Sequence, residues 1–282
     1  MAHMAKLPDY TNMTYHEAIR IAIINDDDAK VNSMLENGYD VNDRERHPRR
    51  IRTKPELLRL APSRRTGARE SSWPLLVTAA AHYKIRWVII LMELGANVDD
   101  SSVFYNNMTA LMTVVQRLRH TNFGDHRRGG EDYQSDGPDE LPEHKLALAL
   151  VHILLFYGAD PDTQQGLGSM SALHKATLHY DSEMVRLLID CGAQVNLENT
   201  DGVTARQLAN KAFIEEGDCE SKDSEELDTI KYIFKLHAKH KLHTFGRSYA
   251  YKSSLEGILN RHGVMDQNLY NILGMFGHVN VE

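Results

Sequence analysis

Three histidines near the carboxyl end have a spacing that could gather imidazoles for metal binding. His237, His240 and His243 lie at i, i+3 and i+6, which places them along one side of a helix. A zinc site would need a further ligand in fixed tetrahedral geometry. Lys239 and Lys241 lie between the histidines, so we interpret this segment as a basic helix end and predict no metal site.

The two cysteines, Cys191 and Cys219, are too few for a disulfide framework. Cys191 precedes a glycine and is expected to be a small buried residue. Cys219 lies in an acidic stretch, which should raise the pKa of its thiol and argues against a nucleophile. A reducing intracellular compartment, the cytoplasm or the nucleus, is therefore predicted.

Motifs of catalysis are missing from the sequence. There is no Gly-rich phosphate loop, no H-E-x-x-H and no G-x-S-x-G. The acidic run Asp26-Asp27-Asp28 lacks the alternation and closing Glu of a calcium loop and is expected to form a solvated helix–helix turn. We predict no enzyme activity, no cofactor and no small-molecule substrate. Catalysis would need a site in an insertion or in the tail.

Positive charge is concentrated in one segment of a chain whose net charge is −7. Residues 44–70 hold ten Lys and Arg against three Glu, a net +7, so the rest of the chain carries −14. This segment favours an acidic protein partner. Nucleic-acid binding and a localisation signal are the alternatives, although the segment has no aromatic residue to stack on bases. Its cations are Arg44, Arg46, Arg49, Arg50, Arg52, Lys54, Arg59, Arg64, Arg65 and Arg69.

The elements that would position these residues follow from an internal repeat. An aliphatic residue, two residues, two large apolar residues, two residues and glycine recur from Val31, Val88, Val151 and Val185. A fifth copy begins at Ile230 and lacks the glycine. Apolar positions at i, i+3 and i+4 share one face of a helix, and glycine supplies the left-handed residue that ends it.

Another pattern, typical of the start of a helix, lies upstream of most copies and predicts a first helix in each unit. It reads Trp73-Pro74-Leu75-Leu76, Thr109-Ala110-Leu111-Met112, Ser171-Ala172-Leu173-His174 and Thr204-Ala205-Arg206-Gln207. The two-part pattern resembles the ankyrin repeat, which reads T-P-L-H-x-A-A and then V-x-x-L-L-x-x-G-A-D-V-N over about 33 residues. The resemblance implies an all-α solenoid of stacked helix–turn–helix units with β-hairpin fingers, binding a partner on its concave face. It also implies that His174 bonds to the backbone of neighbouring turns.

Spacing between the copies predicts five repeats and three insertions. The repeats lie near 15–43, 71–100, 107–163, 168–200 and 201–237, after an amino-terminal tag or arm at 1–14. An insertion near 44–70 lies between the first two repeats, and acidic insertions near 119–143 and 215–226 lie between the two helices of the third and fifth repeats. Because the basic insertion falls at a finger and the acidic ones at helix–helix turns, we expect positive charge at the finger end and negative charge at the opposite end.

Candidate binding residues follow from equivalent positions in the repeats. The finger-tip position holds Trp73, Met108, Met170 and Val203, which would form an apolar stripe if exposed or pack against adjacent fingers. On the inner helices, one position holds His82, Arg117 and His179, and an adjacent position expected at the surface holds Thr78, Thr113 and Lys175. We predict that a protein partner binds here, with Trp73 as the anchor; a solvated helix face is the alternative.

The last segment, residues 238–282, falls outside the repeats. Ser254 could cap one helix that ends at Gly263, and Asp266 could cap another with Leu269, Ile272, Leu273 and Phe276 on one face. We predict that this pair covers the exposed end of the last repeat, with a docking helix for a partner as the alternative. No apolar run reaches the roughly 18 residues of a membrane span, and no membrane association is predicted.

Overall fold

The computed structural model describes residues 10–11, 13–42, 74–102, 107–122, 143–165, 167–215, 222–240, 255–261 and 263–275. The basic segment 44–70, Trp73 and Cys219 therefore lie outside the described residues, as does most of each acidic insertion. The helix–turn–helix units expected from the repeat pattern are present in the part that is described.

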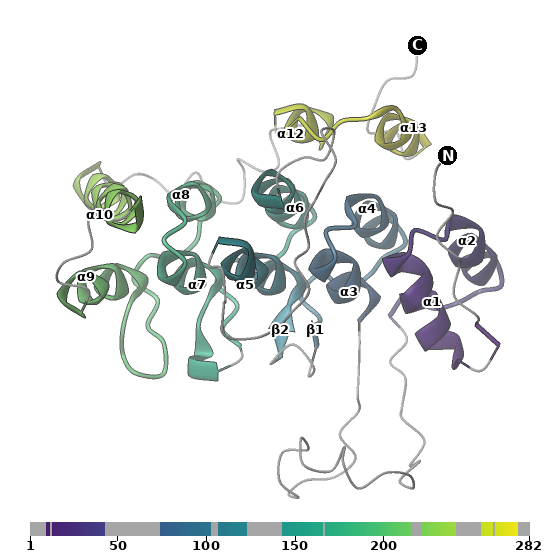
Figure 1. Cartoon of the computed structure of the whole chain (residues 1–282), viewed down its shortest axis with the longest axis horizontal. Helices are drawn as coiled ribbons and strands as arrows, with labels where there is room; N and C mark the ends of the chain where they lie inside the picture. The colour runs from purple at the N-terminus through teal and green to yellow at the C-terminus, as the bar shows by residue number, and fades with distance from the viewer. Residues whose placement is uncertain are drawn as a thin grey trace, which may run out of the picture.

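Five helix pairs stack side by side in two layers (Figure 1). The inner layer contains α1 (Tyr15–Ile24), α3 (Leu75–Ala81), α5 (Ala110–Asn122), α7 (Ala172–Leu178) and α9 (Ala205–Glu215). The outer layer contains α2 (Asp28–Glu36), α4 (Ile85–Glu93), α6 (Glu143–Phe156), α8 (Ser182–Asp190) and α10 (Lys222–His240). Small residues such as Ala79, Ala80 and Ala176 are buried where inner helices pack, which confirms the all-α solenoid.

The ends of the helices follow the predicted signals. Gly38, Gly95, Gly158 and Gly192 have φ between +83° and +95° after the outer helices, a region open to glycine at little cost. Ser171 and His174 form a reciprocal capping box at the start of α7, which satisfies backbone donors that a helix start leaves unpaired. Local sequence therefore fixes where these helices begin and end.

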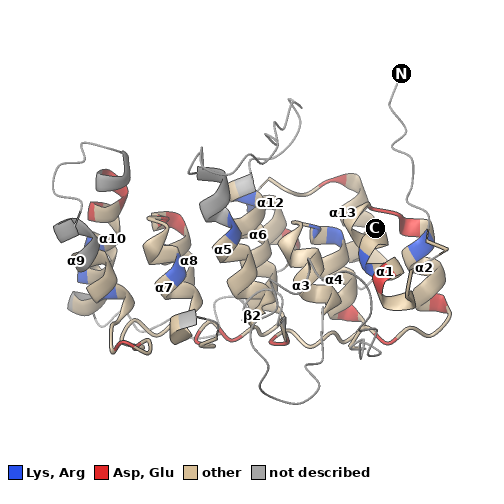
Figure 2. Cartoon of the chain, turned by 60° about the horizontal axis from the view of Figure 1, so that its bottom comes forward, with Lys and Arg blue, Asp and Glu red and all other residues tan. Residues whose placement is uncertain are grey.

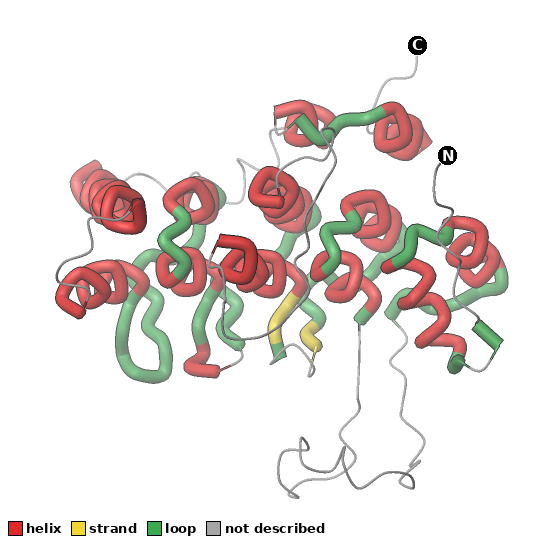
Figure 3. The backbone as a smooth tube through the Cα atoms, viewed as in Figure 1, coloured by secondary structure: helices red, strands yellow, loops and turns green. Residues whose placement is uncertain are grey.

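Fingers project from one edge of the stack (Figure 3). One finger contains the antiparallel pair β1 (Ser101–Ser102) and β2 (Met108–Thr109), and isolated bridges join Gln165 to Met170 and Glu198 to Thr204. The short helix η3 (Leu167–Ser169) lies in the third finger. β-Hairpin fingers are thus present, as expected.

A ladder of side-chain hydrogen bonds joins the bases of successive fingers. The Asn42 amide oxygen accepts from the backbone N–H of Asn97 at 2.8 Å. A carboxylate oxygen of Asp99 accepts from Asp160 N–H at 3.0 Å, and one of Asp162 accepts from Gln194 N–H at 2.7 Å. The same bond recurs although its partners are 55, 61 and 32 residues apart, so the stacking register is independent of the inserted residues.

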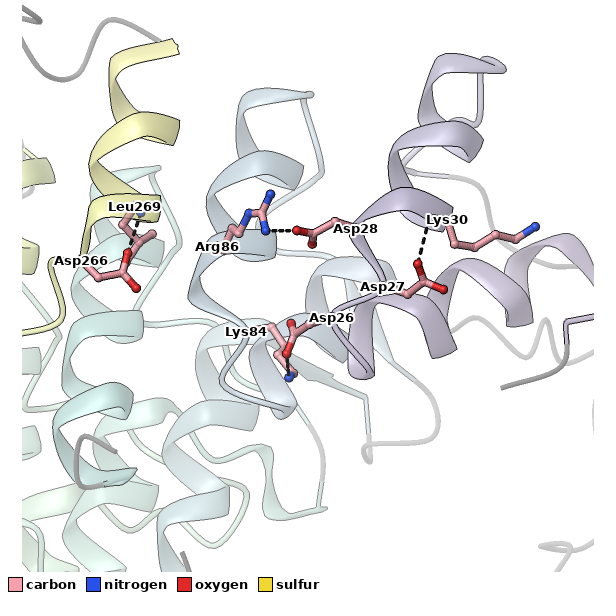
Figure 4. Close-up of polar contacts among 8 residues, drawn as sticks. All are labelled: Asp26, Asp27, Asp28, Lys30, Lys84, Arg86, Asp266 and Leu269. Carbon is pink, nitrogen blue, oxygen red and sulfur yellow. Dashed lines mark hydrogen bonds and ion pairs between the residues drawn. The ribbon is translucent and has the colours of Figure 1, made fainter. Parts of the chain in front are cut away.

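The acidic turn at Asp26-Asp27-Asp28 links the first two repeats (Figure 4). Asp26 pairs with Lys84 and Asp28 pairs with Arg86, whereas Asp27 accepts from Lys30 N–H at 3.1 Å and caps α2. The sequence suggested that this turn is only solvated. The structure corrects that expectation, because the cations that face it come from the α3–α4 turn and the start of α4, 58 residues along the chain.

The carboxyl-terminal helices α12 (Leu255–Arg261) and α13 (Gln267–Met275) do not cover the last repeat. α12 packs on α6 and α13 packs on α4, so the pair forms a third layer over the outer helices of the second and third repeats (Figure 1). The predicted cap on the last repeat is therefore wrong. The predicted helix signals are confirmed at Asp266, which accepts from Leu269 N–H at 2.7 Å, and at Gly263, whose φ is +64°.

The outward-facing residues of the outer helices explain this placement. One residue after the valine that recurs in each outer helix, α2 has Asn32 and α8 has Arg186, both exposed, whereas α4 has Ile89 and α6 has His152, both buried. Every residue from 147 to 155 in α6 is buried. A helix that is apolar all round needs cover on every side. In the last pair the exposed positions of α9 and α10 are mostly polar, with Tyr232 as the large hydrophobic exception at 60% exposure. The polar ones include Arg206, Gln207, Asn210, Asp228 and Lys235.

Within the described helices, none combines the length and hydropathy that a bilayer crossing requires.

Candidate partner-binding face

Inner helices α1, α3, α5 and α7 pack against one another in sequence order and present a continuous face beside the fingers (Figure 2). Arg20 on α1 and Arg117 on α5 both act on the ring of His82, which directly follows α3, and Lys175 on α7 bonds to Gln116, the residue before Arg117. We call Arg20, His82, Arg117 and Lys175 the cationic row. Figure 2 shows the basic positions on α1, α5 and α7 across the same face, with acidic positions at both of its edges.

His82 lies at the carboxyl end of α3 and is half-buried. Its pKa is lowered, first by burial and then by the positive charges of Arg117, Lys84 and Arg20. Groups on α1, on the α3–α4 turn and on α5 therefore act on one imidazole. The sequence placed His82 and Arg117 at equivalent positions, and the structure brings them into electrostatic range of each other.

Lys175 is the most unusual member of the row. Its side chain is on α7 and only 7% of the residue is exposed. The ammonium donates a hydrogen bond to the side-chain oxygen of Gln116 on α5 at 3.1 Å, and no carboxylate in the described ranges pairs with it. Burial lowers its pKa, with no acidic group acting in the opposite direction. Burying a cation against a neutral acceptor alone is unfavourable.

The position shared by Thr78, Thr113 and Lys175 was expected at the surface, and this expectation is wrong. All three residues are buried. The Thr113 hydroxyl donates to the carbonyl of Thr109 at 2.8 Å, which is how a buried threonine inside a helix is satisfied. The position therefore lies between packed inner helices, and of its three residues Lys175 is the most exposed, at 7%.

The finger-tip positions do not form an exposed apolar stripe in the described fingers. Met108 is only 6% exposed, and Met170 and Val203 are partly buried. Met108 is buried, so it is unavailable as a surface contact in this finger. Trp73, the predicted anchor, lies outside the described residues, so its role stays a prediction. His179 caps the carboxyl end of α7 and is half-buried.

The described fingers carry negative charge. Residues 38–42, 95–102, 107–109, 158–165, 167–171 and 192–204 contain seven carboxylates and no Lys or Arg: Asp40, Asp99, Asp100, Asp160, Asp162, Glu198 and Asp201. The expectation of a positive finger end therefore fails for these fingers. It rested on the basic segment, whose cations (Arg44, Arg46, Arg49, Arg50, Arg52, Lys54, Arg64 and Arg65 among them) lie outside the described residues.

Other candidate residues have structural roles. The His174 ring accepts from Ser171 N–H at 3.3 Å through Nδ1 and donates to the carbonyl of Val203 at 3.1 Å through Nε2, which confirms the predicted bond to a neighbouring turn. Cys191 is buried, and burial raises the pKa of its thiol to about 12. Among the described residues, no group of His, Cys, Asp and Glu is arranged to hold a metal ion.

Arg20 and Gln116 belong to this face although the sequence did not single them out. Arg20 falls on α1, in the repeat with the weakest first-helix pattern, so no frame assigned it an equivalent position. Gln116 immediately precedes Arg117, and its role depends on the reach of Lys175 from the next repeat. A contact between residues 59 positions apart has no local signal in sequence.

Comparisons with known proteins agree with this architecture. A model of the ankyrin-repeat family, three copies long, matches residues 144–220. A segment of 65 residues is 35% identical to the E3 ubiquitin-protein ligase KEG of Arabidopsis thaliana, and the match spans 23% of this chain and 4% of that protein. The family match shows ankyrin repeats at residues 144–220, and the stacked helix pairs, the glycine-ended outer helices and the fingers extend the same ankyrin-repeat architecture over the described residues before them.

Proposed function

We propose that this chain is a non-catalytic interaction module, an adaptor, scaffold or regulator that binds a segment of a partner protein along the inner helices and fingers. Ankyrin repeats generally act in protein–protein interaction. The observation that carries the proposal is the cationic row, which spans four consecutive helices on one face and is bordered by acidic fingers. Side chains arranged over a continuous surface suit recognition of an extended segment.

The alternative is nucleic-acid binding through residues 44–70. Ten cations in that segment would neutralise phosphates. The described fingers contain seven carboxylates and no Lys or Arg, which disfavours binding of a continuous row of phosphates along them. We therefore keep a protein as the proposed partner. The match to a ubiquitin ligase covers 4% of that protein, so we carry over no ligase activity.

Affinity capture from a cell lysate tests the proposal, with three forms of the chain as bait. These are the unchanged chain, Arg117→Glu on the binding face and Arg186→Glu on the outer helix α8, where the side chain is 75% exposed. A partner retained by the unchanged chain and by Arg186→Glu, lost with Arg117→Glu and resistant to nuclease supports the proposal. Retention by all three forms would contradict it, and loss on nuclease treatment would favour nucleic acid.

We also propose an intracellular, reducing location. Cys191 is a free buried thiol, and its raised pKa leaves little thiolate for exchange chemistry. Alkylation and mass mapping of protein freshly extracted from cells would contradict this location if Cys191 were found in a disulfide.

A further inference from the structure

The cationic row contains a buried charge, Lys175, that pairs with no carboxylate among the described residues. The corresponding positions in the second and third repeats are Thr78 and Thr113, both neutral and both buried. Lys175 is also buried, with 7% of the residue exposed against 1% for each threonine, yet it carries an ammonium whose bond in the described residues goes to the neutral amide oxygen of Gln116. A buried charge is normally paired with an opposite charge. The missing anion is therefore the first sign of a ligand.

The members of the cationic row belong to successive inner helices, so the distance between neighbouring helices sets the distance between neighbouring members. Adjacent inner helices pack side by side, and packed helices are about 8–10 Å apart. An extended chain advances about 3.3–3.4 Å per residue. One step from helix to helix thus equals about three residues of an extended segment that crosses the face. The distance from Arg20 on α1 to Lys175 on α7 covers three such steps, or about nine residues.

We propose that the face binds an extended acidic protein segment whose carboxylates recur at about every third residue, with one of them pairing with the Lys175 ammonium. This inference rests on the function proposed above and names the chemistry of the partner. Acidic residues at both edges of the face repel any anion that strays from the row, so spacing as well as net charge selects the ligand. A nucleic acid, with phosphates at every nucleotide, meets that repulsion along its whole length.

Binding should have a signature that a structural role for Lys175 would not produce. In Lys175→Met a thioether of similar length replaces the ammonium, which removes the desolvation penalty and leaves stability unchanged or higher. The same change removes the ion pair with the ligand and should weaken binding about tenfold. Arg186→Met, which removes one positive charge from the exposed outer face, is the matched control and should change neither quantity.

The experiment measures fluorescence anisotropy of blocked synthetic peptides with the full chain at physiological salt. One peptide of about twelve residues has glutamate at every third position with serine and alanine between, and its isomer has the same glutamates in one run. We expect the spaced peptide to bind at least about tenfold more tightly than its isomer and to raise the pKa of His82, followed by NMR, because a carboxylate nearby favours the imidazolium. A single-stranded oligonucleotide serves as competitor.

Equal binding of the two isomers, or stronger binding of the oligonucleotide, would overturn the proposal, since net charge alone would then be recognised. So would a Lys175→Met chain that is less stable and binds unchanged. A partner captured through Arg117 combined with no binding of either peptide would reject the acidic ligand and leave the interaction module standing. Captured partners that ignore Arg117→Glu would instead remove the function on which this inference rests.

Discussion

At the scale of single residues, the neighbouring carboxylates of Asp26 and Asp27 have different structural roles. Asp27 accepts a backbone N–H at the start of α2 and a hydroxyl bond from Tyr10, whose pKa is raised to about 12 by burial and by this carboxylate. Asp26 instead pairs with Lys84 across an exposed gap. Helix caps contribute about 0.5–2 kcal/mol, whereas exposed ion pairs contribute about 0–1 kcal/mol. The cap should therefore dominate.

Replacing these groups one at a time tests that ranking. We expect Asp27→Ala to lower the free energy of unfolding by about 1–2 kcal/mol and Lys84→Met to lower it by less than about 1 kcal/mol. Urea unfolding at low and high salt measures both. The Lys84→Met effect should fade in salt because the pair is exposed, while the Asp27→Ala effect should persist. A larger loss from Lys84→Met would show that the ion pair is the stronger link.

The interactions of His144 should stabilise the fold more at acidic pH than at higher pH. It lies at the start of α6 with Nε2 at 3.1 Å from Asp181 and Nδ1 at 3.6 Å from Glu183, both on the α8 side. The bond to Asp181 raises its pKa, burial opposes this, and Asp181, Glu183 and Glu226 add to the rise. A raised folded-state pKa adds stability that is complete below about pH 6.5 and is lost as pH rises through the folded value.

We therefore expect the difference in unfolding free energy between the unchanged chain and His144→Gln to be largest below about pH 6.5 and to shrink above it. His82 and His174, whose pKa values are lowered, act in the opposite direction, but they cancel when the two proteins are compared at each pH. Glu183→Gln should flatten the difference. A gap that is constant with pH would mean that His144 contributes by packing and not by charge.

At the scale of elements, sequence was informative where the signal is local. Outer helices, their terminal glycines, the Ser171 and Asp266 caps and the fingers all follow from residues within one repeat. Two things could not be found that way. The burial of Lys175 depends on Gln116 in the previous repeat, and the docking of α12 and α13 depends on helices more than 100 positions earlier. A signal for the latter was present in residues 146–156 of α6, which are apolar except for His152, and in Ile89, which replaces the polar residue of α2 and α8.

Tail docking is tested by Leu273, which is fully buried on α13. Leu273→Ala should lower the free energy of unfolding by about 2–3 kcal/mol, because it removes buried methyl groups and leaves a cavity. Asn271→Ala changes an exposed residue of the same helix and should cost less than about 0.5 kcal/mol. Chemical denaturation compares the two. Equal, small effects would mean that α13 is not held against α4 in solution.

On the scale of the whole molecule, the third layer makes the tail part of the fold. Its buried aliphatic residues include Leu255, Ile258, Leu259, Leu269, Ile272 and Leu273. Burying each contributes about 1.5–3 kcal/mol before the entropy of ordering the segment is subtracted. The net stabilisation is several-fold smaller than the gross sum. It comes from covering α4 and α6, the two outer helices whose outward residues are buried.

A chain ending after His240 should therefore be less stable by at least about 2 kcal/mol and should bind a hydrophobic dye that the full chain does not bind. Loss of dye binding when a peptide of residues 251–282 is added back would show that the exposed surface is the one the tail covers. A truncated chain with unchanged stability and no dye binding would refute the three-layer arrangement.

The third layer becomes available only late in synthesis of the chain. α4 and α6 leave the ribosome well before α12, since about a hundred residues separate Phe156 from Leu255. At about 5–20 residues per second, the outward face of α6 waits roughly 5–20 s for α12, and that of α4, about 170 residues ahead of α13, waits roughly 9–35 s. During that interval a nascent chain presents Ile89 and its neighbours to chaperones and to other nascent chains. If synthesis stops after α10 and before α12, all five repeats have been made but the apolar outward faces of α4 and α6 stay exposed. Such a chain should be more prone to aggregation than the full chain.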